Sequence, residues 1–382
     1  MNGVRTLIRP PTADEVPVGR RMLFAERRRA TLTILGVACA LLHVLVLRGI
    51  FAGAIDRVTH YIRTSPAEIF VSQAGVRTMH MSASALPTAT VAQVAAVPGV
   101  AWAEPIGFAT GSIAGPDGRQ LSYVIGYDTA TGRGGPSTLE TGRQPGAGEA
   151  VLDRLAADQL GLGLEDKVTV LGTPLRVVGL SSGGTSIANT TVFVSAAQFQ
   201  GMGHHEVSYV LVGVEDGASA STVAGRVQDA VPGATVQTRE EFADSETRVV
   251  TDMSADLLRL MSTVGLLIAL AVIALGLMTA TLSRIRDYAV LKALGAPTVR
   301  LAGTVAVQVV LTVALATAVA TVLALGLGEL LPLLSSSVPV SVTATAVAQT
   351  AGGALLAGLV AALWPLRRIA SVDAATAFRE TR

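Results

Sequence analysis

Residues 260–283 read LMSTVGLLIALAVIALGLMTATLS and contain no aspartate, glutamate, lysine or arginine. A helix needs about 20 apolar residues to cross the roughly 30 Å hydrocarbon layer of a membrane, because its backbone groups must pair within the segment. A charged side chain near the middle of such a helix costs about 3 kcal/mol on insertion scales. The uncharged run therefore predicts a membrane-spanning helix and places the chain among membrane proteins.

Three other stretches have the length and composition of membrane spans, residues 31–55, 301–330 and 338–366. The last is uncharged, and the middle one carries no charge before Glu329. His43 and Arg48 interrupt the first, but Arg48 lies near one end, where its long side chain can reach the membrane interface. The composition agrees, since 50% hydrophobic and 15% charged residues and a mean hydropathy of +0.54 are too apolar for a soluble chain of this length.

A cleaved signal peptide is the alternative for the first apolar stretch, because Ala52, Gly53 and Ala54 resemble a cleavage site. The charged leader before it is long for a signal, and Arg48 would stand just before the cleavage site. We therefore expect an uncleaved membrane helix.

Basic residues gather in three short segments beside the predicted spans, and cytoplasmic segments of membrane proteins are enriched in them. All three segments fall on one side of a four-span topology, so both termini are expected in the cytoplasm and the long intervening segment outside it, with the protein in an inner (plasma) membrane. The basic residues are Arg20, Arg21, Arg27, Arg28 and Arg29, then Arg284, Arg286, Lys292 and Arg300, then Arg367, Arg368, Arg379 and Arg382.

The predicted fold class is a polytopic α-helical membrane protein, with four transmembrane helices and a large α+β extracytoplasmic domain between helices 1 and 2. The segments are a cytoplasmic N-terminal segment (1–30), transmembrane helix 1 (31–55), a two-lobed α+β domain (56–255), transmembrane helix 2 (256–283), a cytoplasmic coupling-helix loop (284–300), transmembrane helix 3 (301–330), an outer loop (331–337), transmembrane helix 4 (338–366) and a cytoplasmic tail (367–382).

Alternating and periodic stretches within the outer domain predict short strands and helices separated by glycine and proline. Residues 151–160 have helical spacing, and residues 207–238 form a β-α-β unit that can pair with an opening strand at 67–73. Residues 240–259 look helical and run without a breaker into the second span. They form either one continuous helix that couples the outer domain to the membrane or a plain amphipathic linker.

Common motifs for binding ATP, a dinucleotide or a catalytic zinc ion are absent from the sequence. Neither of the two lysines, Lys167 and Lys292, follows a glycine, so no Gly-Lys-Ser/Thr loop is available to cradle the phosphates of ATP. A G-x-G-x-x-G dinucleotide turn and an H-E-x-x-H zinc helix are also missing. The net charge of +1 argues against a nucleic-acid-binding protein. Because the motifs above are missing, we expect a non-catalytic protein with no cofactor of its own.

Histidines are the remaining candidates for a chemical site. The best metal candidate is His-His-Glu at residues 204–206, with His80 and His60 elsewhere. Adjacent side chains on a strand point to opposite faces, which favours an exposed polar turn over a metal site. His43 is either a functional ionisable group within the membrane or a neutral helix-packing residue. No metal site is expected.

Residues 283–300, SRIRDYAVLKALGAPTVR, are the most informative segment outside the predicted spans. Apolar residues recur at three- and four-residue spacing and Pro297 closes the pattern, as in a short amphipathic helix. Such a helix can anchor in lipid headgroups or dock in a groove of a cytoplasmic partner.

The longer stretch TATLSRIRDYAVLKALGAPTVRL, residues 279–301, resembles the signature of MacB/FtsX-type ABC transporter permeases. The likeness covers nearly the whole chain, and stretches such as VAAVPGVAWAEPI (94–106) and GEAVLDRLAADQLGLGLEDKVTV (148–170) resemble the DevC-like branch of that family. One helix, an outer domain and then three helices is also the order of elements in the family.

This resemblance implies a non-catalytic transmembrane subunit, a permease that forms a homodimer and works with two copies of a separate cytoplasmic ABC ATPase. The ATPase would bind ATP and Mg and carry out the hydrolysis. Closure of the ATPases would be passed through the loop helix and the membrane helices to the outer domain, an arrangement called mechanotransmission. Carried over by position, the candidates for contact with the ATPase are Arg286, Asp287, Tyr288, Leu291, Lys292, Leu294 and Gly295.

Two functions of different class fit the resemblance. The first is ATP-driven export or extraction of a lipophilic molecule, a peptide or a lipoprotein, with membrane lipids around the permease and a membrane-fusion adaptor as a further partner. The second is FtsX-like signalling, in which the outer domain regulates a cell-wall hydrolase and nothing is transported. The large outer domain favours export.

Overall fold

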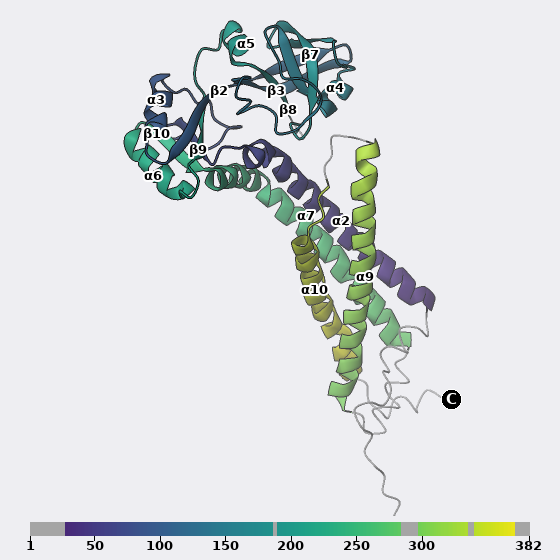
Figure 1. The fold of residues 1–382 in the computed structure, drawn as a ribbon. Helices are drawn as coiled ribbons and strands as arrows, with labels where there is room; N and C mark the ends of the chain where they lie inside the picture. Colours follow the sequence, from purple (N-terminus) through teal and green to yellow (C-terminus); the bar gives the residue numbers. More distant parts are fainter. Residues whose placement is uncertain (1–26, 186–188, 284–296, 335–339, 371–382) are drawn as a thin grey trace, which may run out of the picture. The chain divides into compact units, whose positions relative to one another are not determined.

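The structure is a computed structural model that describes residues 27–185, 189–283, 297–334 and 340–370 (Figure 1). The chain divides into two compact units. One unit contains Met1–Gly49, Leu257–Gly328 and Val342–Arg382, and the other contains Ile50–Asp256 and Glu329–Ser341.

Four long helices each contain an apolar segment long enough to cross a membrane. They are α2 (Arg27–Thr64), α7 (Arg239–Ser283), α9 (Thr298–Leu334) and α10 (Ala344–Ala370), and the apolar segments are Ala30–Thr64, Leu258–Ser283, Ala302–Leu331 and Ala344–Arg367. One helix precedes the sheet domain and three follow it, which confirms the predicted fold class.

The first of these helices extends beyond the end predicted from the sequence. Helix α2 continues to Thr64, past the predicted end at residue 55, because residues 56–64 contain no glycine or proline. The helix ends just before Pro66, and a residue that precedes proline disfavours the helical conformation.

Within their unit the helices approach closely at glycines. A Cβ atom on Gly36 of α2 would lie 3.0 Å from Val272 of α7, and one on Gly358 of α10 would lie 2.7 Å from Val309 of α9. Small residues let helix backbones come together in this way. Arg48 Nη1 of α2 also donates a hydrogen bond of 2.6 Å to Gln349 Oε1 of α10, which satisfies one polar group of each helix.

The unit that contains Ile50–Asp256 is called the outer unit, or outer domain. It is built on a mixed sheet in the order β10-β1-β9-β2-β3-β8-β5-β7-β4, with β6 paired to β2 and β7. Most pairs are antiparallel, but β3–β8 and β5–β7 are parallel. The strands are β1 (Ile69–Gln73), β2 (Val100–Gly115), β3 (Gly118–Tyr127), β4 (Leu139–Gly142), β5 (Glu149–Asp153), β6 (Lys167–Val170), β7 (Thr173–Ser181), β8 (Thr190–Ser195), β9 (Tyr209–Val214) and β10 (Ala234–Thr238).

The sheet carries two lobes joined by the long strand β2 (Figure 1). The first lobe packs α3 (Ala89–Ala95) and α6 (Ala220–Ala230) on β1, β9 and β10 around a core of valines. The second lobe packs α4 (Arg154–Gln159) and α5 (Ala196–Gly201) on β3 to β8. Residues 100–106 of β2 pair with β9, and residues 107–115 pair with β3, so one strand serves both lobes.

Most of the outer elements agree with the sequence-based prediction. Strands β9 and β10 both pair with β1, as predicted for the unit at 207–238. The helix predicted at 151–160 is wrong in its first turn, because β5 continues to Asp153 and α4 begins at Arg154. The reason is a helix cap, since the Asp153 side chain accepts a hydrogen bond of 3.0 Å from Leu155 N.

Candidate functional site

The two longest helices end in one hydrophobic core of the outer unit, which we call the junction core. Ile62 of α2 and Phe242 of α7 are both fully buried there. The ring of Phe242 stacks on Phe70 of β1 with centroids 4.9 Å apart. Both lobes contribute to the remainder, which includes Ile106, Ile125, Tyr127, Val151, Val178, Phe193, Tyr209 and Leu211. The junction core therefore packs the ends of both helices against both lobes.

Helix α2 is attached through two polar side chains in its last turn. Tyr61 Oη donates a hydrogen bond of 2.9 Å to Gly134 O, and His60 Nε2 lies 3.5 Å from Ser137 Oγ. Gly134 has a φ of +84°, and a Cβ atom there would lie 2.5 Å from Ile106. Glycine at this position lets the loop reach Tyr61 without a steric clash.

The same loop, residues 128–135, also bridges the two lobes. It follows β3 of the second lobe, and its Arg133 guanidinium lies over the ring of Trp102 on β2, 4.4 Å from the ring centroid. Arg133 Nη1 additionally donates to Glu104 Oε1 at 3.4 Å. A cation over an indole face contributes about 0.5–1 kcal/mol at such a partly exposed site, so the bridge is a modest one.

Helix α7 is attached through a buried carboxylate. Glu246 is 1% exposed, and its Oε1 accepts backbone hydrogen bonds from Met79 N and, at 3.1 Å, from His80 N. His80 Nδ1 lies 3.2 Å from the same oxygen but makes no hydrogen bond in this geometry. Among the described residues, no arginine or lysine forms an ion pair with Glu246.

Aromatic rings surround this carboxylate. The His80 ring meets the Tyr123 ring edge-on with centroids 4.7 Å apart, and Phe108 stacks on Tyr123 at 5.2 Å. Burial, together with the nearby charge of Glu246, raises the pKa of Tyr209 and the pKa of Tyr123 above the usual tyrosine value. Both phenols therefore stay neutral, and Tyr209 donates a hydrogen bond of 3.3 Å to Thr78 O.

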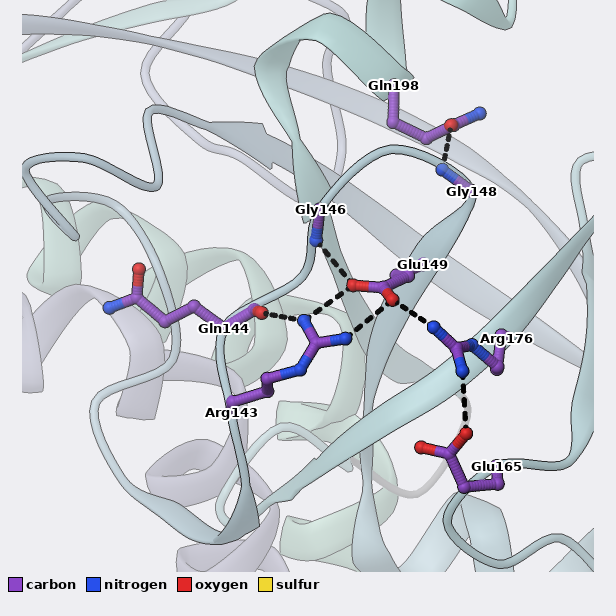
Figure 2. A network of polar contacts seen from close by, with 8 residues as sticks. All are labelled: Arg143, Gln144, Gly146, Gly148, Glu149, Glu165, Arg176 and Gln198. Atoms are coloured by element: carbon purple, nitrogen blue, oxygen red, sulfur yellow. Dashed lines mark hydrogen bonds and ion pairs between the residues drawn. The ribbon is translucent and has the colours of Figure 1, made fainter.

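A second buried carboxylate lies in the second lobe, where Figure 2 shows its polar contacts. Glu149 is 7% exposed and accepts two hydrogen bonds of 2.6 Å from Arg143 and one of 2.5 Å from Arg176. Gly146 N donates a further bond of 2.9 Å. Hydrogen bonds from Arg143 and Gly146 lower the pKa of Glu149 to about 2, so the carboxylate is charged at all physiological pH values.

Residues 179–183, GLSSG, have the spacing of a nucleophile elbow. Such an elbow needs a serine exposed on a sharp turn between a strand and a helix. Ser181 is instead the last residue of β7, is 1% exposed and donates its hydroxyl to Leu152 O at 3.3 Å. A loop follows it through Thr185, so this serine has a structural role.

The structure places the predicted histidines in different surroundings. The His204 ring packs in a tilted arrangement against Phe199, with centroids 5.0 Å apart. His60 lies at the attachment of α2 and His80 at the attachment of α7. His43 is exposed on α2. No group of three His, Cys, Asp or Glu side chains is arranged to hold a metal ion within the part of the chain that the structure describes.

The predicted contacts with an ATPase lie outside the described residues, so the structure does not place them. They are Arg286, Asp287, Tyr288, Leu291, Lys292, Leu294 and Gly295.

Sequence reasoning missed Glu246, Glu149 and Tyr61. For Glu246 a signal was available, because Phe242 and Glu246 stand four residues apart in a segment already predicted as helical, and residues at that spacing share a helix face.

Comparisons with known proteins agree with this architecture. Residues 30–230 match the family model of the MacB-like periplasmic core domain, and residues 259–374 match that of the FtsX-like permease C-terminal region. An uncharacterized ABC transporter permease of Mycobacterium tuberculosis (strain ATCC 25618 / H37Rv) is 26% identical over 373 residues, covering 94% of this chain and 99% of the relative. One of Mycobacterium bovis is 25% identical over 370 residues, with the same coverage.

Two solved structures are also similar. The periplasmic region of MacB from Actinobacillus actinomycetemcomitans has a TM-score of 0.37 and 13% identity, covering 48% of this chain and 94% of that one. The extracellular domain of the transporter YknZ from Gram-positive bacteria has a TM-score of 0.36 and 14% identity, covering 45% of this chain and 98% of that one.

Proposed function

Because this chain belongs to the MacB/FtsX family of ABC transporter permeases, we propose that it passes the ATP-driven movement of a separate ATPase subunit to its own outer domain. Its permease relatives indicate a non-catalytic transporter subunit, and the family implies an ATPase partner. ATP and Mg then bind on that partner, and this chain carries no cofactor.

The observation that carries the proposal is the continuity of α7. The helix runs from Arg239 to Ser283 without a break, and it contains both the buried anchors Phe242 and Glu246 and the apolar segment Leu258–Ser283. No glycine or proline occurs between Arg239 and Leu258, and sharp helix kinks almost always need such residues. A stiff helix can carry a displacement from the membrane to the junction core.

The ATPase end of the relay is proposed to be the loop at residues 284–300. Its basic and apolar residues, among them Arg286 and Leu291, suit a short helix that docks in a groove of the partner. The loop falls inside the matched FtsX-like region. This arrangement requires both termini in the cytoplasm, which the arginines beside the spans favour, and an inner (plasma) membrane location. The permease acts as a homodimer.

The relayed movement has two candidate outcomes. Export or extraction of a lipophilic molecule, a peptide or a lipoprotein, with or without a membrane-fusion adaptor, needs an outer domain that changes shape, and the junction core joins both lobes to both helices. FtsX-like regulation of a cell-wall hydrolase would use the same relay. Loss of a transported substrate on deletion of the gene supports export, whereas loss of hydrolase activity alone supports signalling.

The test is co-purification in detergent with the ATPase encoded beside this chain. The double variant Leu291→Arg, Gly295→Asp should lose the ATPase, whereas the wild type retains it in stoichiometric amounts. The matched control is Leu121→Arg, Gly201→Asp, which places the same changes on the outer domain, where Leu121 is 58% exposed and a Cβ atom on Gly201 meets nothing within 4 Å. A wild-type chain that binds no ATPase would refute the relay.

A further inference from the structure

An irregular segment of the outer domain, residues 76–86, connects β1 to α3, and we call it the strap. It contains no helix and no regular strand, and its one bridge pairs Leu86 with Val207. Hydrogen bonds to Ser72 of β1 and to Ser208, the residue before β9, hold its two ends. Val76 O accepts from Ser72 Oγ at 2.7 Å, and Ser84 Oγ donates to Ser208 O at 2.5 Å.

The middle of the strap is held differently. Thr78 O accepts from Tyr209 Oη, and the backbone N–H groups of Met79 and His80 donate to Glu246. Two of these three bonds therefore end on a side chain of α7. The Met79 side chain is 2% exposed in the junction core, whereas Met81 is 58% exposed. The strap thus passes from the interior to the surface within three residues.

The bonds to Glu246 are strong but can be exchanged. A hydrogen bond to a charged acceptor contributes about 1.5–3 kcal/mol, more than one between neutral groups. The bonds run to backbone N–H groups rather than to an arginine fork, so water can take the place of either partner once the strap moves away. Local openings of this kind lie at the low end of the stability range of a protein.

We propose that the strap is a latch that Glu246 closes and that displacement of α7 releases, so that movement of this helix exposes Met79 and His80 at the surface of the outer domain. The inference rests on the proposed relay and adds its end point. Glu246 is a positioning residue in it. Release would uncover the apolar Met79 side chain beside the exposed Met81 and so change the surface that faces a substrate or a partner.

The experiment is hydrogen exchange of the Met79 and His80 amides, followed by mass spectrometry on the full chain in complex with its ATPase. Both amides should exchange roughly tenfold faster or more when the complex is trapped with ATP and vanadate than without nucleotide. The amide of Val71 on β1, which is paired to strands on both sides, should not change. Equal exchange at Met79 and His80 in both states of a complex that hydrolyses ATP would overturn the latch.

Substitutions test the latch without nucleotide. Glu246→Ala should speed exchange at Met79 and His80 roughly tenfold or more, because both acceptor bonds are lost, and Glu246→Gln should have a smaller effect. The matched control is Glu240→Ala, a residue of the same helix whose side chain is 72% exposed, and it should leave exchange unchanged. If Glu246→Ala leaves both amides protected, the latch is wrong even where ATPase binding holds. If the wild-type chain binds no ATPase, the relay is wrong. The exchange rates of the Glu246 variants then still test whether Glu246 holds the strap.

Discussion

Glu149 and Glu246 are both buried glutamates of the outer domain, but different groups bind their carboxylates. Glu149 joins strands of the second lobe and contacts two arginines, Arg143 and Arg176 (Figure 2). Glu246 belongs to a helix that extends into an apolar segment, and its hydrogen bonds come from backbone N–H groups. An arginine fork fixes a carboxylate in one geometry, whereas backbone donors on an irregular segment can leave. The first carboxylate therefore stabilises the fold, and the second suits a contact that breaks and forms.

The largest effect is expected from interrupting α7 between Glu246 and the membrane segment. Asp252→Pro removes a helical hydrogen bond and costs about 3 kcal/mol or more in a helix interior. The nucleotide-dependent exchange at Met79 and His80 should disappear, while the amides around Glu149 keep their protection. Hydrogen exchange of the ATPase complex measures both regions together.

The control for the proline substitution is Asp252→Ala, which places a good helix former at the same exposed position. It should behave as the wild type. A proline variant that retains the nucleotide-dependent change would show that α7 does not carry the movement.

The next largest effect is expected from removing the charge of Glu149, which two arginines hold in place. Glu149→Gln removes the negative charge that faces two arginines, and hydrogen bonds to charged groups contribute about 1.5–3 kcal/mol. The thermal midpoint of the full chain in detergent should fall, with no change in ATPase coupling. Glu165→Gln is the matched control, because Glu165 is 66% exposed and contacts Arg176 alone among the described ion pairs, so its loss should cost less than about 1 kcal/mol. A coupling defect in Glu149→Gln would remove the distinction between the two sites.

The contribution of Glu149 to stability should depend on pH. The pKa of Glu149 is lowered to about 2 from an unfolded value near 4.3, so its stabilising contribution is complete above that unfolded value and is lost as pH falls toward 2. The stability difference between wild type and Glu149→Gln should therefore be constant from about pH 8 to 5 and shrink below about pH 4. A difference that shrinks already near neutral pH would contradict the assigned ion pairs.

Sequence patterns predicted the membrane helices and missed the attachment points, for a physical reason. Charge-free runs such as residues 260–283 are local signals, because insertion into lipid depends on the length and composition of the segment itself. The partners of Glu246, Met79 and His80, lie 167 and 166 residues away in the chain. The periodicity of α7 therefore does not reveal which segment Glu246 contacts. The start of α4 after Asp153 could have been predicted, because aspartate is a common cap before a helix. The apolar run Ala150–Leu152 before it suits a strand and a helix equally well, so the sequence does not distinguish the two.

The smallest effect compares two tyrosines of the junction core, one with a hydrogen-bond partner and one without. Tyr61→Phe removes the bond to Gly134 O and should cost about 1 kcal/mol, together with a small loss of protection in residues 128–135. Tyr127 is fully buried, and its hydroxyl has no partner among the described residues. Because a buried polar group without a partner is itself costly, Tyr127→Phe should leave the thermal midpoint unchanged or raise it. If both variants lose stability equally, the contact of Tyr61 with the loop is only packing, and α2 is held less specifically than α7.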